Sequence, residues 1–324
     1  MGRPVISKLD REQARHYSSD SDANLTSNDT RPFRSIYDDA FFLGSDSYVE
    51  GRSREAIHLR AVGEVSMDLS LVLAACLISL VGLPHGALDP LVATRYGLIR
   101  DLRSTAWFLA IYTSIVGLVI GFWLLLPIVA LLLFLLISAI HFGRDWKYKI
   151  PFGGFGYGAF VMGLPAWAFP EQVEQIFGFL IFQDTASIPL VMLQVTGLTG
   201  GLLLIIDRKN LSTLGLGELL ILSLSAFTLE PLWYFVVYFC GFHSPRHLVA
   251  EFRNMTRETR LIAYVVMLLL TIITLGVAAV SGAHIEKYYE SVNIVMYQVI
   301  FIGLAALTVP HMCLLEWAAR QHRE

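Results

Sequence analysis

The sequence predicts an all-α integral membrane protein with eight to nine transmembrane helices, and three observations support this fold class. Hydrophobic residues make up 55% of the 324 residues, and the mean hydropathy is +0.58. Charged residues are only 16%, against about 25% in a typical soluble domain. Apolar runs of about 20 residues, the length that a bilayer core requires, recur from residue 67 onward.

The first 66 residues have a different composition. Residues 1–66 mix charges of both signs with Ser, Asn and Asp, and no apolar stretch there is long enough for a cleavable signal peptide. We expect a largely disordered tail, with Phe33, Tyr37, Phe41 and Phe42 as its candidate surface contacts. The transmembrane domain would then cover residues 67–318, followed by a short cytoplasmic tail at 319–324.

Prolines and polar loops divide the apolar part into spans. Pro127 splits the long run that begins at residue 105, and Pro231 separates the sixth span from the seventh. The fourth and sixth spans are short, so eight spans remain an alternative to nine. The predicted spans are 67 to beyond 84, 105–125, 127–146, 152–167, 188–206, 214–229, 232–249, 261–280 and 292–317.

Basic residues follow every second span, as they do in cytoplasmic loops. The connections after spans four, six and eight are poor in basic residues, and this alternation supports nine spans with a cytoplasmic C-terminus. It would also place the tail outside, an export that the lack of a signal peptide makes difficult. The basic residues after the odd spans are Arg95, Arg100, Arg103, Arg144, Lys147, Lys149, Arg208, Lys209, Arg246, Arg253, Arg257, Arg260, Arg320 and Arg323.

Five of the nine histidines lie late in spans that run from outside to inside. They are His85, His141, His243, His247 and His311. All five are expected at similar depth, toward the cytoplasmic side. Because ionisable groups in membrane segments are costly and usually functional, their shared level predicts a metal site; interfacial anchoring or a hydrogen-bonded polar cluster is the alternative. The other four, expected on the surface, are His16, His58, His284 and His322.

Spacing adds detail to this site. Three pairs are four residues apart: His243 with His247, His85 with Asp89, and His141 with Asp145. Residues at this spacing share a helix face, so two imidazoles would reach one metal and the aspartates would hold imidazole N–H groups. Ion pairs of the aspartates with Arg144 or Arg246 are the alternative. Pro84, Pro245 and Pro310 adjoin the histidines, and we expect them to bend the helices and free carbonyls.

The residue types leave the metal and the substrate open. Clustered imidazoles suit Fe, Cu, Zn or Ni, and Cys76, Cys240 and Cys313 are expected to serve packing. Aromatic residues surround the predicted site, either as an interfacial belt or as a tunnel for a long apolar substrate. They are Phe142, Trp146, Trp233, Tyr234, Tyr238, Phe239 and Phe242.

Four motifs in order resemble the Brp/Blh family, over residues 67–318. They are Gly-Leu-Pro-His-Gly-Ala-Leu-Asp (82–89), His-Phe-Gly-Arg-Asp-Trp (141–146), Phe-Cys-Gly-Phe-His-Ser-Pro-Arg-His (239–247) and Thr-Val-Pro-His-Met (308–312). That family comprises membrane-bound β-carotene 15,15′-dioxygenases of bacteria and archaea, which supply retinal to microbial rhodopsins. One position departs from the expected pattern: Pro90 follows Asp89, where His was expected, and this removes a possible extra ligand.

The resemblance implies an Fe(2+) enzyme of the cell membrane that cleaves the central double bond of β-carotene with O2, giving two all-trans-retinal. Its implied ligands are His85, His141, His243 and His247, with His311 as a further ligand or a near neighbour. Substrate contacts are then expected at Phe142, Trp146, Trp233, Tyr234, Tyr238 and Phe242. The implied partners are β-carotene, O2 and the bilayer, with a functional link to a microbial rhodopsin. The net charge of −3 suggests no nucleic-acid partner.

Two other functions compete with this hypothesis. A di-iron desaturase or hydroxylase would need more histidines with adjacent pairs, whereas this chain has one H-x-x-x-H and no His-His. A transporter or non-enzymatic carotenoid-binding protein would more often place ionisable residues near the bilayer midplane. Clustering toward one face therefore favours an enzyme.

Overall fold

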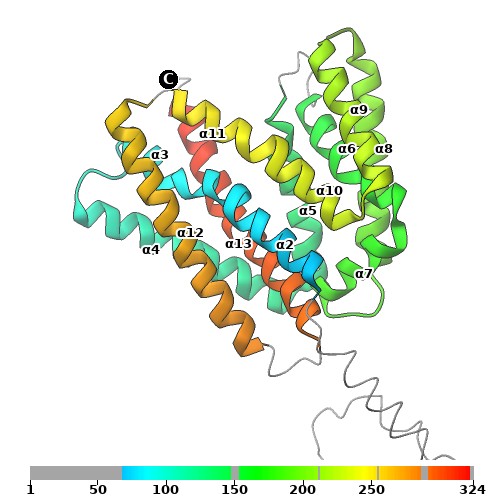
Figure 1. Ribbon diagram of the computed structural model, residues 1–324, viewed down its shortest axis with the longest axis horizontal. Coiled ribbons are helices and arrows are strands. Elements are labelled where there is room, and N and C mark those ends of the chain that lie inside the picture. Colours follow the sequence, from blue (N-terminus) through cyan, green and yellow to red (C-terminus); the bar gives the residue numbers. More distant parts are fainter. Residues whose placement is uncertain (1–67, 147–152, 211, 254, 286–290, 322–324) are drawn as a thin grey trace, which may run out of the picture. The chain divides into compact units, whose positions relative to one another are not determined.

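The computed structural model describes residues 68–146, 153–210, 212–253, 255–285 and 291–321, and within these ranges the regular elements are all helices (Figure 1). The expectation of a disordered tail concerns residues outside this part of the chain. So do the expectations for Phe33, Tyr37, Phe41, Phe42, His16, His58, His322, Lys147, Lys149 and Arg323.

The first predicted span continues to Arg95 and changes helix type along its length. α2 (Leu69–Leu77) continues as the π-helical η3 (Ile78–Gly82), the 3₁₀-helical η4 (Leu83–Leu88) and α3 (Asp89–Arg95). Pro84 and Pro90 lack the N–H that an α-helix needs, so regular α-helical bonding is interrupted here. The changes in helix type fall around the segment that carries His85.

The prolines end and start helices where the sequence predicted. α4 (Leu102–Leu125) is followed by α5 (Pro127–Gly143), and Pro231 begins α10 (Pro231–Tyr238). The seventh span then passes through a second π-helical segment, η6 (Phe239–His243), into α11 (Ser244–Arg253). The two longest helices, α12 (Arg257–Ile285) and α13 (Val292–Gln321), are also the last two.

Between α5 and α10 along the chain lie α6 (Gly153–Ala168), α7 (Pro170–Ile181), α8 (Ser187–Ile206) and α9 (Thr213–Thr228). The sequence pattern predicts a connection, and not a helix, where α7 lies. Pro170 occupies its first turn, and its buried residues Val173, Phe177 and Leu180 give it one apolar face. A helix of 12 residues is too short for the 20-residue pattern that marks a span, and this explains why it was missed.

Among the residues that the structure describes, five helical runs are long and apolar enough to cross a membrane, which indicates a membrane protein. They are Leu69–Arg95, Leu102–Leu125, Ser187–Ile206, Arg257–His284 and Val292–Gln321, and Pro127–Gly143 and Thr213–Thr228 are shorter apolar helices. The count of eight to nine spans stays a prediction.

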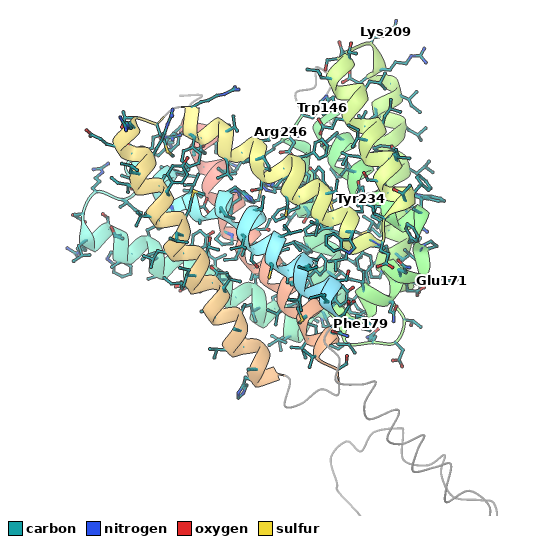
Figure 2. All side chains as sticks on the ribbon, viewed as in Figure 1. Trp146, Glu171, Phe179, Lys209, Tyr234 and Arg246 are labelled. Atoms are coloured by element: carbon teal, nitrogen blue, oxygen red, sulfur yellow. The ribbon has the colours of Figure 1, made fainter. Side chains whose placement is uncertain are left out.

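Ion pairs join the ends of spans predicted to share a side. Arg95 contacts Glu251 at 2.8 Å, and Arg144 contacts Glu316 at 2.5 Å. The first pair links spans one and seven, and the second links spans three and nine. In Figure 2, Trp146, Lys209 and Arg246 lie in the upper part of the molecule, whereas Glu171 and Phe179 lie in the lower part. The helix ends that each ion pair joins therefore lie near each other, and the alternating topology stays a prediction.

Candidate metal centre

The five histidines singled out in the sequence come together from four separate helical runs. His85 lies in η4, His141 in α5, His243 ends η6, His247 lies in α11, and His311 lies in α13. The His243 ring centre is 4.7 Å from those of His141 and His247 and 5.0 Å from that of His85. The His311 ring centre lies 5.5 Å from His85 and 5.3 Å from His141.

Three of these side chains bring ring nitrogen atoms close together. One ring nitrogen each from His85, His141 and His243 lie within 4.8 Å of one another. The Nε2 atoms of His141 and His243 are 3.1 Å apart, and both residues are buried. Uncharged nitrogen atoms that converge in a buried place are a typical environment for a transition-metal ion.

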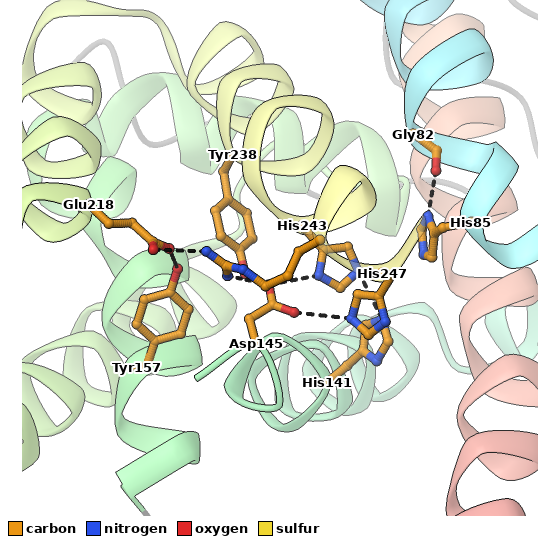
Figure 3. Close-up of polar contacts among 10 residues, drawn as sticks. Gly82, His85, His141, Asp145, Tyr157, Glu218, Tyr238, His243 and His247 are labelled. Carbon is orange, nitrogen blue, oxygen red and sulfur yellow. Dashed lines mark hydrogen bonds and ion pairs between the residues drawn. The ribbon is translucent and has the colours of Figure 1, made fainter. Parts of the chain in front are cut away.

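Asp145 holds two of the imidazoles from the side (Figure 3). His243 Nδ1 lies 2.9 Å from Asp145 Oδ2, and His247 Nε2 lies 3.1 Å from Oδ1. The expected pairing of Asp145 with His141 is not made, although the residues are four apart in sequence. α5 ends at Gly143, so Asp145 lies in the following turn and faces the seventh span instead.

The expected alternative partner of Asp145 is also present, and it extends the polar network. Arg246 lies 3.5 Å from Asp145 Oδ2 and 2.8 Å from Glu218. Glu218 accepts a 2.5 Å hydrogen bond from the Tyr157 hydroxyl (Figure 3). Arg144, the other candidate, pairs with Glu316.

Asp89 is the hydrogen-bond partner of His311 and not of His85. Its Oδ1 lies 2.7 Å from His311 Nδ1, and its Oδ2 accepts a 2.8 Å hydrogen bond from the Tyr112 hydroxyl. His85 instead donates from Nδ1 to the Gly82 carbonyl at 2.5 Å (Figure 3). A backbone carbonyl thus takes the place that four-residue spacing predicts for Asp89, and no sequence pattern pointed to Tyr112.

A largely apolar cavity of about 940 Å³ reaches His85, His141 and His311. This is near the upper end of the roughly 300–1,000 Å³ that small-molecule sites occupy. Phe142, Tyr234 and Tyr238 line it as expected. Additional aromatic residues of the lining include Phe235 and Phe301, whose positions in apolar helices gave no separate signal in the sequence.

Three predicted substrate contacts lie elsewhere. Trp146 stacks on Tyr157, with ring centres 5.0 Å apart. Trp233 donates from Nε1 to the Ser70 hydroxyl at 2.7 Å. Phe242 packs against the hydrophobic core. The described lining of the cavity includes none of the three, so their role as substrate contacts stays a prediction.

The donor set fits a metal ion. Beyond the converging nitrogens, His141 Nδ1 and His311 Nε2 are buried without a hydrogen-bond partner, although buried polar groups are nearly always paired. The carboxylate that contacts His243 matches the usual partner of a metal-bound imidazole.

Comparison with known proteins decides the family. The family model described as Beta-carotene 15,15'-dioxygenase matches residues 76–319. The chain belongs to this family. This match confirms the resemblance that the four motifs indicated. Because the members of the family are enzymes, the chain is an enzyme rather than a transporter.

One curated relative supports the same assignment. The protein named Beta-carotene 15,15'-dioxygenase from Uncultured marine bacterium 66A03 is 29% identical over 269 residues, which cover 77% of this chain and 94% of the relative. No solved structure matches the chain significantly.

Proposed function

We propose that this chain cleaves the central 15,15′ double bond of β-carotene with O2, giving two molecules of all-trans-retinal. The observation that carries the proposal is the convergence of histidine nitrogens beside a large apolar cavity, in a chain of the β-carotene 15,15′-dioxygenase family. Iron(II) is the proposed cofactor, held by His85, His141, His243 and His247. When bound, the iron would supply the activation of dioxygen.

The protein groups around this site have separable roles. Asp145 accepts from His243 Nδ1, which leaves Nε2 of that ring available and fixes the plane of the imidazole. Gly82 does the same for His85 through its carbonyl. Phe142, which packs edge-on against His243 with ring centres 4.8 Å apart, covers the site with apolar surface and excludes water.

β-Carotene has no polar group to bind, so its position must follow from shape. The cavity supplies a mostly apolar wall, with Tyr234, Phe235 and Phe239 along it. If the central double bond of the polyene lies beside His85 and His141, the two halves of the molecule extend from the metal in opposite directions. Regioselectivity would then depend on the length available on each side.

The cavity lining suggests a lipid-side entrance between α4 and α12. Leu124 of α4 and Ile273 and Val277 of α12 belong to the lining, and all three are more than half exposed. In a membrane such exposed apolar side chains face lipid, where the substrate dissolves. We place the enzyme in the cell membrane with the metal site toward the cytoplasmic side.

The substrate is a rod comparable to the hydrocarbon core, roughly 30 Å thick. A rod centred on a metal near one face cannot run along the membrane normal. The tunnel is therefore proposed to lie oblique to the membrane or nearly in its plane. A substrate-bound structure with the polyene upright would contradict this arrangement. The product, retinal, would supply a microbial rhodopsin.

The decisive experiment measures retinal in membranes of a carotene-producing bacterial host that expresses this chain. Wild type should form retinal, and His243→Ala should form none because one converging nitrogen is lost. His58→Ala is the matched control and should behave as wild type. Absence of retinal from well-expressed, iron-loaded wild type would reject central cleavage of β-carotene and direct the search to another carotenoid.

A further inference from the structure

The short helix α7 forms a wall of the cavity at the end away from the histidines. In Figure 2, its residue Phe179 lies in the lower part of the molecule, whereas Arg246, which contacts Asp145, lies in the upper part. The face of α7 toward the cavity is apolar and consists of Val173, Ile176, Phe177 and Leu180. Phe177 is the largest side chain of this face and is 7% exposed.

Two buried side chains from other helices hold the end of α7 in place. Gln298 of α13 donates from Nε2 to the Phe179 carbonyl at 2.9 Å. Trp123 of α4 donates from Nε1 to the Leu180 carbonyl at 2.8 Å. The last carbonyls of a helix have no partner within it, so these two donors satisfy groups that would otherwise be unpaired. The wall is therefore fixed to α4 and α13.

The same two helices also reach the histidine cluster, and this fixes the distance from the cluster to the wall. His311 of α13 and Tyr112 of α4 both contact Asp89 there. Within the described lining, His311 and Gln298 mark its two ends on α13, and the helix rises about 20 Å between them. One half of a substrate roughly 30 Å long fits into this space with its ring against α7.

We propose that α7 is the end stop for one half of the carotene, and that Phe177 is a specificity-determining residue because its bulk sets how far the ring can advance. Gln298 and Trp123 are positioning residues that hold the stop. The inference rests on the proposed function and names the part of the chain that selects the bond to be cleaved.

A stop is needed because the chemistry alone does not select the central bond. Cleavage by O2 breaks one carbon–carbon double bond and places one oxygen atom on each new carbonyl, and this balance is the same for every double bond of the polyene. The neighbouring double bond is one repeat of the polyene away. A small advance of the ring into α7 would therefore bring the wrong bond beside the histidines.

The products that the purified, iron-loaded full chain forms from β-carotene in micelles test the proposal. Wild type should give retinal. Phe177→Ala should let the substrate advance toward α7, so that cleavage also gives one product longer than retinal and one shorter. We expect the share of this unequal pair, measured by liquid chromatography with mass spectrometry, to rise at least about tenfold, as expected when an apolar pocket loses its discrimination of one small group.

Gln298→Leu tests the positioning role. It should raise the share of the unequal pair less than Phe177→Ala does, with unchanged iron content, because α7 loses one of its two anchors. Gln194→Leu is the matched control: Gln194 Nε2 also donates to a backbone carbonyl, that of Ala166, at 2.9 Å, but Gln194 is not part of the described lining. This variant should give the wild-type products.

Retinal alone, or no product, from a folded Phe177→Ala protein would overturn the end stop. If that variant does not fold, Phe177→Leu decides by the same product ratio. Equal product ratios for Gln298→Leu and Gln194→Leu would overturn the positioning role of Gln298. Wild type that forms no retinal would reject the proposed function itself, whereas retinal from wild type with unchanged products from the Phe177 variants would reject only the stop.

Discussion

At the scale of single residues, Asp145 is the side chain on which most of the site depends. Its side chain is fully buried. Its two oxygens accept hydrogen bonds from His243, His247 and the Tyr238 hydroxyl, and Arg246 lies nearby. A carboxylate offers about four acceptor positions, so this one is nearly saturated.

Replacing Asp145 by Asn should weaken metal binding by roughly 10–100-fold, the usual effect of losing the partner of a metal-bound histidine. The amide nitrogen would face imidazole N–H groups that need acceptors, so His243 would lose its fixed orientation. Iron content after dialysis against a chelator measures the effect. Asp184→Asn, at an exposed position, should retain wild-type iron; equal retention by both variants would contradict this role for Asp145.

At the scale of helices, the two π-helical segments lie next to the histidines and pack against each other. Ser244 donates to the Val81 carbonyl at 2.6 Å, and the Cys240 thiol donates to the Leu77 carbonyl at 3.4 Å. A Cβ at Gly82 would collide with the Phe239 ring. The Leu77 carbonyl at the N-cap of η3 and the Val81 carbonyl within it are thus satisfied by side chains of η6 and of the first residue of α11. Such π turns are frequent at functional sites, and here they set the positions of His85 and His243.

Close contact between α6 and α8 depends on glycines that face each other. A Cβ at Gly163 would collide with Gly197 Cα, and one at Gly200 would collide with the Gly156 carbonyl. Small residues allow helix backbones to approach in this way in membranes.

Gly163→Ala should therefore destabilise the protein by about 1–3 kcal/mol, the usual cost of overpacking. Gly276→Ala is the control, because nothing lies within 4 Å of a Cβ built there. Thermal unfolding in detergent, followed by helical circular dichroism, distinguishes the two. A Gly163→Ala transition at the wild-type temperature would show that α6 and α8 can separate without cost.

At the scale of the whole described domain, the cavity and the lipid-facing helices together determine how an apolar substrate reaches the metal. α4 and α12 bury few of their residues, yet both contribute to the cavity lining. Substrate would therefore enter from the membrane and not from water.

Val277→Trp should raise the KM for carotene severalfold, because the larger side chain would narrow the proposed entrance. Iron content should not change, since Val277 is neither a predicted metal ligand nor a hydrogen-bond partner of one. Val280→Trp is the matched control on the same helix: it is exposed and outside the lining. Kinetics in carotene-loaded micelles provide the measurement, and equal KM values for the two variants would exclude entry beside Val277.

Local patterns in the sequence were enough to predict the helical membrane character, the family, and which histidines gather. Apolar run length, proline positions and charge alternation are local properties, and each predicted span lies close to an observed helix. His85, His141, His243, His247 and His311 were found because ionisable residues are conspicuous in apolar spans.

The partner of each imidazole depends on how the helices pack and could not be predicted from local sequence patterns. Four-residue spacing paired Asp89 with His85 and Asp145 with His141, but Asp89 bonds His311 and Asp145 bonds His243 and His247. The spacing rule assumes a continuous α-helix, whereas His85 lies in a 3₁₀ segment and Asp145 lies beyond the end of α5. Contacts between helices depend on how those helices are turned and packed, and a linear pattern does not contain that information.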